Sequence, residues 1–546
     1  MANTSLQIGN SNWAIKEDNL LGYSTEGKIL LPQPITMTRA SAGTRVNSSG
    51  LIETVELLGS DLVVNGSFAT DLSGWSNKSS TSTWVLGSAI IDNSIGNANS
   101  GIFQNIGLVN GKTYTLTATL KLISADQNGN FVVLTSDSGG GSQTIIYTGD
   151  TLVIGGSSIT KTIEFTIANS DVSIQFACNA TNAVFEIDNV SVKESTKNNL
   201  ARVDYDGTAS SLLVEPERTN LIQYSEDFSN AAWVTLGTIT VTPNDGTSPL
   251  GGMSADKVLG LDSISAISLI VSGTIGTEYT SSVYIKNVDS IMSSLLIRNT
   301  TTVVSCGLNW SGNILTSVTN NTGVTTFTNE GGGWYRLKST YIAIESPQRT
   351  RYYPTKTSIS SSIMLWGAQL EAGSYATSYI PTNGESGGVT RLQDQYEKTG
   401  ISDLINSEEG VLFVEMAALS DSGTDRKITL SDGNVSNQVI IGFSRFASNI
   451  NAEIYSGGVL QTSGWGGTGV TQTNNNKFAI SWGSGTMKFY INGSPMSPQT
   501  GITSPIGLNS LKFSLGNNTL NMFGKVKQLQ VFKTALTDKE LQTLTT

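Results

Sequence analysis

The chain has 546 residues, a formal net charge of −11 and no histidine. Its length is suited to about three or four domains rather than one. The negative charge makes nucleic acid an unexpected ligand and disfavours anionic membrane surfaces, because like charges repel. The absence of histidine excludes Ser-His-Asp and Cys-His catalytic sites and His-ligated zinc or iron. Carboxylate chemistry and oxygen-ligated calcium remain open.

Composition favours strands over helices. Charged residues make up only 14% of the chain, while hydrophobic residues reach 38%, and Gly, Ser, Thr and Asn favour strands and tight turns. The two cysteines, Cys178 and Cys306, lie in strand-like runs, and we expect buried free thiols. No stretch has the roughly 18 apolar residues of a membrane helix. The polar N-terminus lacks the apolar core of a secretory signal, so we expect synthesis in a cytoplasm.

The first segment, residues 1–58, indicates strand, turn and strand without a packed core of its own. Residues 47–50, Asn-Ser-Ser-Gly, predict a turn before Leu51 and Ile52. Residues 59–196 hold alternating apolar and polar runs separated by Gly-rich turns, which is typical of a β-sandwich.

Residues 223–390 repeat the plan of residues 59–196. Each segment ends in an apolar strand beside acidic residues, and each opens with a Phe followed shortly by a Trp: Phe68 and Trp75, then Phe228 and Trp233. We infer a weak internal duplication of one jelly-roll unit.

The last segment, residues 391–546, contains further short strands. Asn492-Gly493 predicts a hairpin turn, and Thr537 with Glu540 predicts a capping box at the start of a short C-terminal helix. The predicted fold class is therefore all-β: several antiparallel β-sandwich (jelly-roll) modules in series, one inserted into another unit, with a short C-terminal helix.

Three stretches resemble a family of phage structural and tail-associated proteins: 20–55, 201–233 and 364–384. In such proteins the Thr-Arg-Ala-Ser-Ala and Arg-Val-Asp-Tyr segments usually lie close together, but here residues 59–196 separate them. That intervening piece resembles carbohydrate-binding modules of the galactose-binding-like jelly-roll type. The resemblance implies that one module is inserted into a surface turn of another unit. The expected domains in chain order are a virion-docking segment (1–58), the insert (59–196), the return of the N-terminal unit (197–222) and a second jelly roll (223–390).

The remaining domain, residues 391–546, resembles concanavalin-A-like and laminin-G-like sandwiches. The stretches 410–416, 487–494 and 524–544 carry this resemblance. It implies a fold that lectins, enzymes and plain structural domains share.

Sugar binding needs a flat aromatic face and planar polar groups for the hydroxyls. Trp465 lies in a glycine-flanked polar stretch with Asn474 and Asn475 nearby, followed by Asn476, which predicts a sugar platform. The alternative is a tryptophan folded back onto its own sandwich. Further candidates are Trp84, Trp310 and Trp334, although the resemblance implies a structural strand start at Trp334. For Trp75, Trp233 and Trp366 we expect core packing.

Calcium is the metal that the resemblance implies, as a structural ion joining the first and last strands of a galactose-binding-like module. Asp188 would supply a carboxylate, with loop carbonyls near Asn65. The alternative, which we favour, is Asp188 hydrogen-bonded to a turn. No cofactor is required.

An enzyme is not expected. Retaining glycosidases need two carboxyls on one face of a strand, but Glu408 and Glu409 are adjacent and would point to opposite faces. The Glu-x-Asp-x-x-Glu spacing does not occur in the last segment.

Three arginines, Arg39, Arg45 and Arg202, recur with the phage-family motif. They either dock the N-terminal region on a particle or hold the split unit together by pairing with acidic residues: Glu53, Asp204 and Asp206. We favour the pairing.

The resemblance implies a phage virion structural protein: a tail fibre, tail-tip protein or capsid-attached fibre whose sandwich modules adhere to host surface glycans. Its expected partners are other virion proteins and host cell-surface glycans, with no nucleic acid, and many copies would strengthen weak contacts. A homo-oligomer, by analogy a trimer, and a virion location are expected. Two alternatives stay open: a capsid decoration or head fibre without ligand, and a tail-associated glycan-degrading enzyme.

Overall fold

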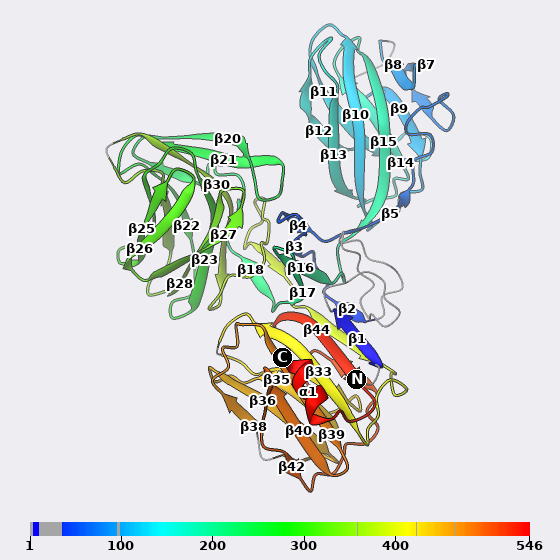
Figure 1. Cartoon of the computed structure of the whole chain (residues 1–546). Helices are drawn as coiled ribbons and strands as arrows, with labels where there is room; N and C mark the ends of the chain where they lie inside the picture. The colour runs from blue at the N-terminus through cyan, green and yellow to red at the C-terminus, as the bar shows by residue number, and fades with distance from the viewer. Residues whose placement is uncertain (1–3, 10–34, 95–98, 358, 422, 463–464) are drawn as a thin grey trace. The chain divides into compact units, whose positions relative to one another are not determined.

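The computed structural model describes residues 4–9, 35–94, 99–357, 359–421, 423–462 and 465–546, with only the backbone described for Gln7 and residues 465–468. Contacts divide the chain into two compact units, Glu56–Thr196 and the pair Met1–Val55 with Lys197–Thr546. Strands dominate both (Figure 1), so the prediction of an all-β chain is confirmed. The part of the phage-like stretch before residue 35 lies outside the described residues.

The inserted unit, Glu56–Thr196, is a two-sheet sandwich. One sheet consists, in spatial order, of β13 (Ile159–Thr166), β10 (Thr113–Ser124), β15 (Val184–Thr196), β8 (Ser88–Asp92) and β7 (Thr81–Val85), with β5 (Leu57–Asp61) pairing β15. The other consists of β12 (Gln143–Leu152), β11 (Gly129–Ser136), β14 (Ser173–Asn179), β9 (Gly101–Asn105) and β6 (Ser76–Lys78).

The period-two pattern of β10 shows why this sequence makes a sandwich. Leu116 and Leu120 are buried between the sheets, while the threonines between them face outward. Two of these, Thr117 and Thr119, contact threonines of β13 across the strand pair at 3.1 and 2.8 Å. Apolar side chains at every second position thus supply the core, and the hydroxyls face water.

The second jelly roll has the same strand order as the inserted unit. One sheet consists of β19 (Val234–Leu236), β22 (Ala266–Val271), β29 (Gln348–Tyr353), β24 (Met292–Arg298), β25 (Thr302–Ser311) and β26 (Ile314–Thr322). The other consists of β20 (Ile239–Thr247), β21 (Met253–Gly260), β30 (Ser361–Ala372), β23 (Glu278–Asn287), β28 (Trp334–Ile342) and β27 (Val324–Gly331). Relative to the inserted unit, the matching order gains only one edge strand in each sheet, β26 in the first and β27 in the second.

The Phe–Trp pairs occupy equivalent places in the two sandwiches. The ring centroids of Phe68 and Trp75 lie 5.3 Å apart, and those of Phe228 and Trp233 lie 4.6 Å apart. Each indole N–H donates to a nearby main-chain oxygen: Trp75 to that of Asn65 at 3.2 Å, and Trp233 to that of Tyr224 at 3.0 Å. The common strand order and these pairs support the inferred duplication.

The C-terminal sandwich incorporates strands from the start and middle of the chain. One sheet consists of β16 (Arg202–Asp206), β17 (Ala209–Val214), β44 (Gly524–Phe532), β33 (Gly410–Ala418), β39 (Asn476–Gly483), β40 (Thr486–Ile491) and β41 (Ser494–Pro495), with β1 (Leu6–Gly9) pairing β44 and β42 (Gln499–Thr500) pairing β40. The other consists of β2 (Thr36–Thr38), β32 (Gln395–Thr399), β43 (Ser510–Lys512), β34 (Arg426–Ser431), β35 (Gln438–Phe443), β36 (Asn449–Ser456) and β37 (Val459–Leu460), with β38 (Trp465–Thr468) pairing β36.

The sequence assigns residues 197–222 to a separate N-terminal unit. In the structure, β16 and β17 instead extend a sheet of the C-terminal sandwich, and β1 and β2 each join one of its sheets. Hydrogen bonding explains this arrangement, since a short strand without its own core is stable only on a larger sheet.

Local predictions for turns and caps are confirmed. A hairpin joins β3 (Thr44–Val46) to β4 (Ile52–Thr54), with the predicted turn between them. Asn492 and Gly493, both with positive φ, connect β40 to β41. Thr537 caps α1 (Asp538–Thr545) in a capping box with Glu540. A two-stranded sheet of β18 (Arg218–Asn220) and β31 (Val389–Arg391) completes the described strands.

No helix in the described part of the chain has the length and hydropathy that crossing a membrane requires.

Candidate functional site

An exposed aromatic ring marks one end of the C-terminal sandwich, where the loops after β33, between β35 and β36, and before β39 come together. The antiparallel registers bring the start of β34, the end of β35 and the start of β36 to this end. Phe446 lies in the loop between β35 and β36 and is 59% exposed. The Arg445 guanidinium lies over its ring, 5.0 Å from the centroid. We call this region the Phe446 end.

Gln472 fixes the loops of the Phe446 end from within. Its buried amide nitrogen donates to the main-chain oxygens of Ser444, Phe446 and Asn449 at 3.1, 2.8 and 2.8 Å. Its amide oxygen accepts from the Arg426 guanidinium at 3.0 Å. Because one side chain holds several loop carbonyls, the ring of Phe446 is presented on a fixed backbone.

Carboxylates and amides lie on the loops at the same end of the sandwich. Asp425 accepts a hydrogen bond from the main-chain N–H of Arg445 at 2.8 Å, and Asp421 accepts one from that of Gln472 at 2.9 Å. Asn474 and Asn475 are exposed in the loop that leads to β39. An aromatic face with planar polar groups beside it is the combination that saccharide binding requires.

The structure places the predicted sugar platform at this end only in part. The backbone of Trp465 begins β38 and pairs with Ala452 of β36, but its side chain lies outside the described residues. Asn476, by contrast, is buried and donates to the main-chain oxygens of Thr471 and Asn474 at 2.9 and 2.7 Å. Phe446 was missed by the sequence reasoning, although an aromatic residue between two strand-like runs could have indicated it.

The other tryptophan candidates differ in accessibility. Trp310 is 7% exposed, its indole N–H donates to Ser293 Oγ at 2.8 Å, and its ring packs against Tyr335. The prediction of a sugar platform at Trp310 is therefore wrong: the strand β25 turns this side chain into the core. Trp334 is also buried and starts β28. Trp84 is 39% exposed, with its indole N–H held by the Phe68 carbonyl at 2.6 Å.

The core assignments for three further tryptophans are confirmed. Trp233 and Trp366 are buried, and Trp75 packs against the core of the inserted unit.

The predicted calcium ligands are engaged by protein groups. The Asp188 carboxylate accepts the main-chain and side-chain N–H groups of Asn189 at 2.7 and 2.9 Å, which is the turn interaction favoured above. Burial raises the pKa of Asp188 above its usual value, against the hydrogen bond from Asn189. The main-chain oxygen of Asn65 accepts from Trp75, and its side-chain amide donates to Asp71 and Ser73. Calcium binding by Asp188 and Asn65 stays a prediction.

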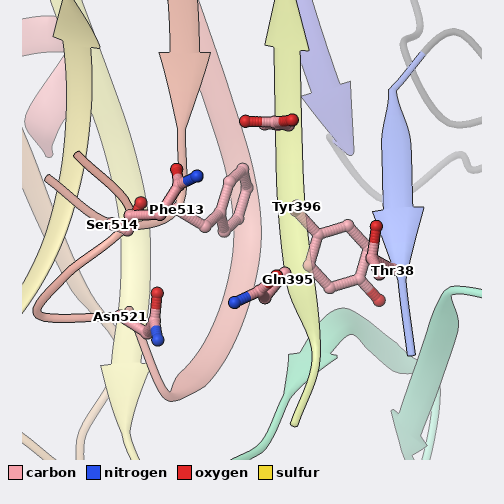
Figure 2. A pocket seen from close by; sticks show the side chains of 8 residues that line it. Thr38, Gln395, Tyr396, Phe513, Ser514 and Asn521 are labelled. Atoms are coloured by element: carbon pink, nitrogen blue, oxygen red, sulfur yellow. The ribbon is translucent and has the colours of Figure 1, made fainter. Parts of the chain in front are cut away.

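A small hollow lies beside β2, β32 and β43 (Figure 2). Tyr396 and Phe513 line it with ring centroids 5.5 Å apart, and Gln395 and Asn521 add amides. Its volume of about 40 Å³ suits water-sized occupants and is far below the space that a sugar ring needs. We therefore assign the hollow no ligand.

The arginines of the phage-like motif pair with acidic residues, but of the partners expected from the sequence only Glu53 takes part, and Asp204 pairs with Lys525 instead. Arg45 contacts Glu53 at 2.5 Å. Arg39 and Arg202 both pair with Asp394, and Arg202 and Arg391 both pair with Glu215. All five members of this cluster of Arg39, Arg202, Glu215, Arg391 and Asp394 are buried; we call it the charged joint. Glu215, Arg391 and Asp394 were missed because their partners are distant in sequence.

The part of the chain that carries the Phe446 end matches the model of a known protein superfamily. Residues 414–542 match the model of the Concanavalin A-like lectin/glucanases superfamily. This part of the chain is similar to concanavalin A-like domains. The Phe446 end is formed by its loops. No curated protein matches the sequence.

Several solved structures resemble parts of the chain. The tandem CBM22-1-CBM22-2 domain of Paenibacillus barcinonensis Xyn10C is 13% identical, with 58% of this chain and 98% of that chain covered and a TM-score of 0.24. The CBM40 module of a Ruminococcus gnavus IT-sialidase, bound to alpha2,3 sialyllactose, is 15% identical, with 26% and 84% covered and a TM-score of 0.22. At these TM-scores we base no argument on them.

Proposed function

We propose that this protein is a non-enzymatic glycan-binding protein whose concanavalin A-like domain binds saccharides at the Phe446 end. The observation that carries this proposal is the exposed ring of Phe446, fixed by Gln472 and flanked by Arg445 and the Asn474–Asn475 loop. An aromatic face stacks on the apolar side of a sugar ring, while amides and carboxylates bind its hydroxyls. The match to a superfamily that includes lectins supports the same class of ligand.

We further propose that the protein acts on a phage particle, as a tail fibre, tail-tip protein or capsid-attached fibre. The support is the sequence resemblance of residues 20–55, 201–233 and 364–384 to phage structural proteins. Virion assembly would display many copies together, and multivalency would convert weak sugar contacts into firm adhesion. Other virion proteins and host surface glycans are the corresponding partners.

Binding at the Phe446 end is tested on a glycan array with purified full-length protein. Phe446→Ala and Trp465→Ala remove the aromatic candidates one at a time, and we expect Phe446→Ala to weaken the bound signal at least tenfold. Ile506→Ala is the matched control, because Ile506 is an apolar residue of the same domain that is 67% exposed and borders the opposite end, beside Asn437.

A signal that survives Phe446→Ala would refute the proposed site. Absence of any array signal for the unmodified protein would favour the purely structural role, as a capsid decoration or head fibre. Release of reducing sugar from a bound polysaccharide would favour the glycan-degrading alternative instead.

A further inference from the structure

Three arginines come together on the outer face of the sheet β19–β26 in the second jelly roll. Register places Arg298 of β24 directly opposite Arg349 of β29, and Arg351 lies two residues along the same strand as Arg349. The residues that alternate with them, Ile297, Thr350 and Tyr352, are buried in the core between the sheets. The arginines therefore occupy the opposite face, which is open to solvent at Arg349.

No carboxylate neutralises this arginine group in the described part of the chain. Arg298 donates to the main-chain oxygens of Asn299 and Thr300 at 3.1 and 2.9 Å. The Nε of Arg351 is buried without a hydrogen-bond partner. The nearby carboxylate of Glu345 is bound instead to Asn299, Thr300 and Thr301. Like charges directly opposite each other destabilise a strand pair, so an uncompensated arginine pair in a chain of net charge −11 indicates an anion-binding role.

Beyond the arginines, the same face becomes neutral and rich in hydrogen-bonding groups. The successive registers place Ser294 opposite Gly307 and Met292 opposite Asn309, with Thr319 and Ser317 on the next strand. The Asn309 amide donates to the hydroxyls of Ser317 and Thr319 at 3.1 Å each. Gly307 itself is buried, because the Met292 methyl group lies over it, 2.9 Å from where a Cβ would be.

We propose that this face binds an acidic saccharide, with the carboxylate of a uronic-acid-like residue at Arg298, Arg349 and Arg351 and the neighbouring sugar along the polar stretch of the same face. Guanidinium groups bind carboxylates through paired hydrogen bonds. Opposite residues in a strand pair lie about 5 Å apart and diagonal ones about 7–8 Å, so the three arginines suit one compact anion. A nucleic acid would need cations spread along a backbone, whereas these three arginines are clustered on two neighbouring strands. The face is distinct from the Phe446 end and does not depend on the function proposed for it.

Titration calorimetry of the full chain with trigalacturonate, and with uncharged trigalactose of the same length, tests the proposal. We expect trigalacturonate to bind more tightly than trigalactose, with an affinity that falls as salt rises. The double change Arg349→Gln with Arg351→Gln should weaken binding at least tenfold. Lys257→Gln is the matched control, since it removes a positive charge from the other sheet of the same jelly roll. Phe446→Ala should leave trigalacturonate binding unchanged.

Thermal unfolding separates a binding role from a structural one. Because Arg349 has no acidic partner among the described residues, Arg349→Gln should leave the unfolding temperature unchanged or raise it. Arg298→Gln gives a second variant of the same kind. Failure of the unmodified protein to bind trigalacturonate overturns the proposal, as does equal weakening by Lys257→Gln. Loss of binding in Phe446→Ala would move the site to the other domain. Equally tight binding of a DNA oligonucleotide, or an arginine-dependent self-association, would also overturn it.

Discussion

At the scale of single residues, the charged joint buries five charges that must be paired with one another. Burial alone would raise the pKa of Glu215, but Arg391 and Arg202 outweigh it and hold that pKa well below its usual value. A carboxyl with a lowered folded-state pKa stabilises the protein above its unfolded pKa, near 4.3, and this contribution is lost as the pH falls. The joint thus stabilises the fold only while every member keeps its charge and partner.

Asp394→Asn tests the joint. Asp394 accepts hydrogen bonds from both Arg39 and Arg202, so the change leaves two buried guanidinium groups undercompensated. We expect the free energy of unfolding to fall by about 3–5 kcal/mol, measured by denaturant titration of the full chain. Asp538→Asn removes a carboxylate that is 69% exposed and pairs with Lys488, and a comparable loss in that variant would contradict the interpretation.

Lys338 gives a pH dependence of the same sign in a more alkaline window. Burial, with a smaller contribution from Arg336, lowers its pKa to about 8. Between that value and the unfolded pKa of about 10.4, the unfolded chain holds a proton that the folded chain has released. Unfolding therefore takes up a proton, and stability from this group rises with pH across the window, by up to about 3 kcal/mol.

Denaturant unfolding at pH 7.5 and pH 10 measures this effect. We expect Lys338→Met to lose the difference between the two pH values, whereas Lys539→Met, at an exposed position of α1, should keep it. An unchanged difference in Lys338→Met would show that other groups cause it.

At the scale of elements, the first strand completes the C-terminal sandwich. β1 pairs with β44 from Leu6 to Gly9, and its Leu6 and Ile8 side chains are buried. A β44 edge left without β1 would expose unpaired backbone groups and apolar surface. The N-terminal residues therefore belong physically to a sandwich whose central strand β33 begins about four hundred residues later in the sequence.

Ile8→Ala measures that contribution. Truncating this fully buried side chain should lower the free energy of unfolding by about 2–4 kcal/mol, because a cavity remains. Val459→Ala, in a strand of the same sandwich where the side chain is 62% exposed, should change it little. Equal effects in both variants would mean that β1 is dispensable.

At the scale of the whole molecule, one compact unit interrupts the other. The ends of the inserted unit lie side by side, because Leu57 of β5 and Thr196 of β15 are register partners. The contacts divide the chain at residues 56 and 197, so that residues 56–196 form one compact unit and the remaining residues form the other. An insertion whose ends are adjacent leaves the host fold geometrically intact.

Excision tests this independence. Replacing residues 58–195 by Asn-Gly, a two-residue hairpin turn, should leave a folded chain whose thermal transition matches one of the transitions of the full protein. Differential scanning calorimetry should show that the other transition, from the inserted unit, is lost. Aggregation of the shortened chain, or loss of both transitions, would show that the units fold only together.

Local signals were sufficient for the parts of the fold that neighbours in sequence decide. The alternation of apolar and polar residues predicted strands such as β10. Asn492-Gly493 predicted the hairpin between β40 and β41, and Thr537 with Glu540 predicted the start of α1. Each of these features depends on residues within a few positions of one another. The Phe–Trp pairs likewise indicated the repeated sandwich. The sequence did not predict that the Trp310 side chain points into the core. Alternate residues of a strand point to opposite faces, and only the assembled sandwich decides which of the two faces is buried.

The sequence by itself determined the fold class, the repeated sandwich and the exclusion of histidine chemistry, because composition and period-two patterning act locally. Only the tertiary structure decided that β1, β2, β16 and β17 join the C-terminal sheets, that Asp394 meets Arg39 and Arg202, and that Arg298 lies opposite Arg349. Strand pairing and buried ion pairs join residues hundreds of positions apart, and their partners are selected by the packing of the whole unit rather than by any local preference.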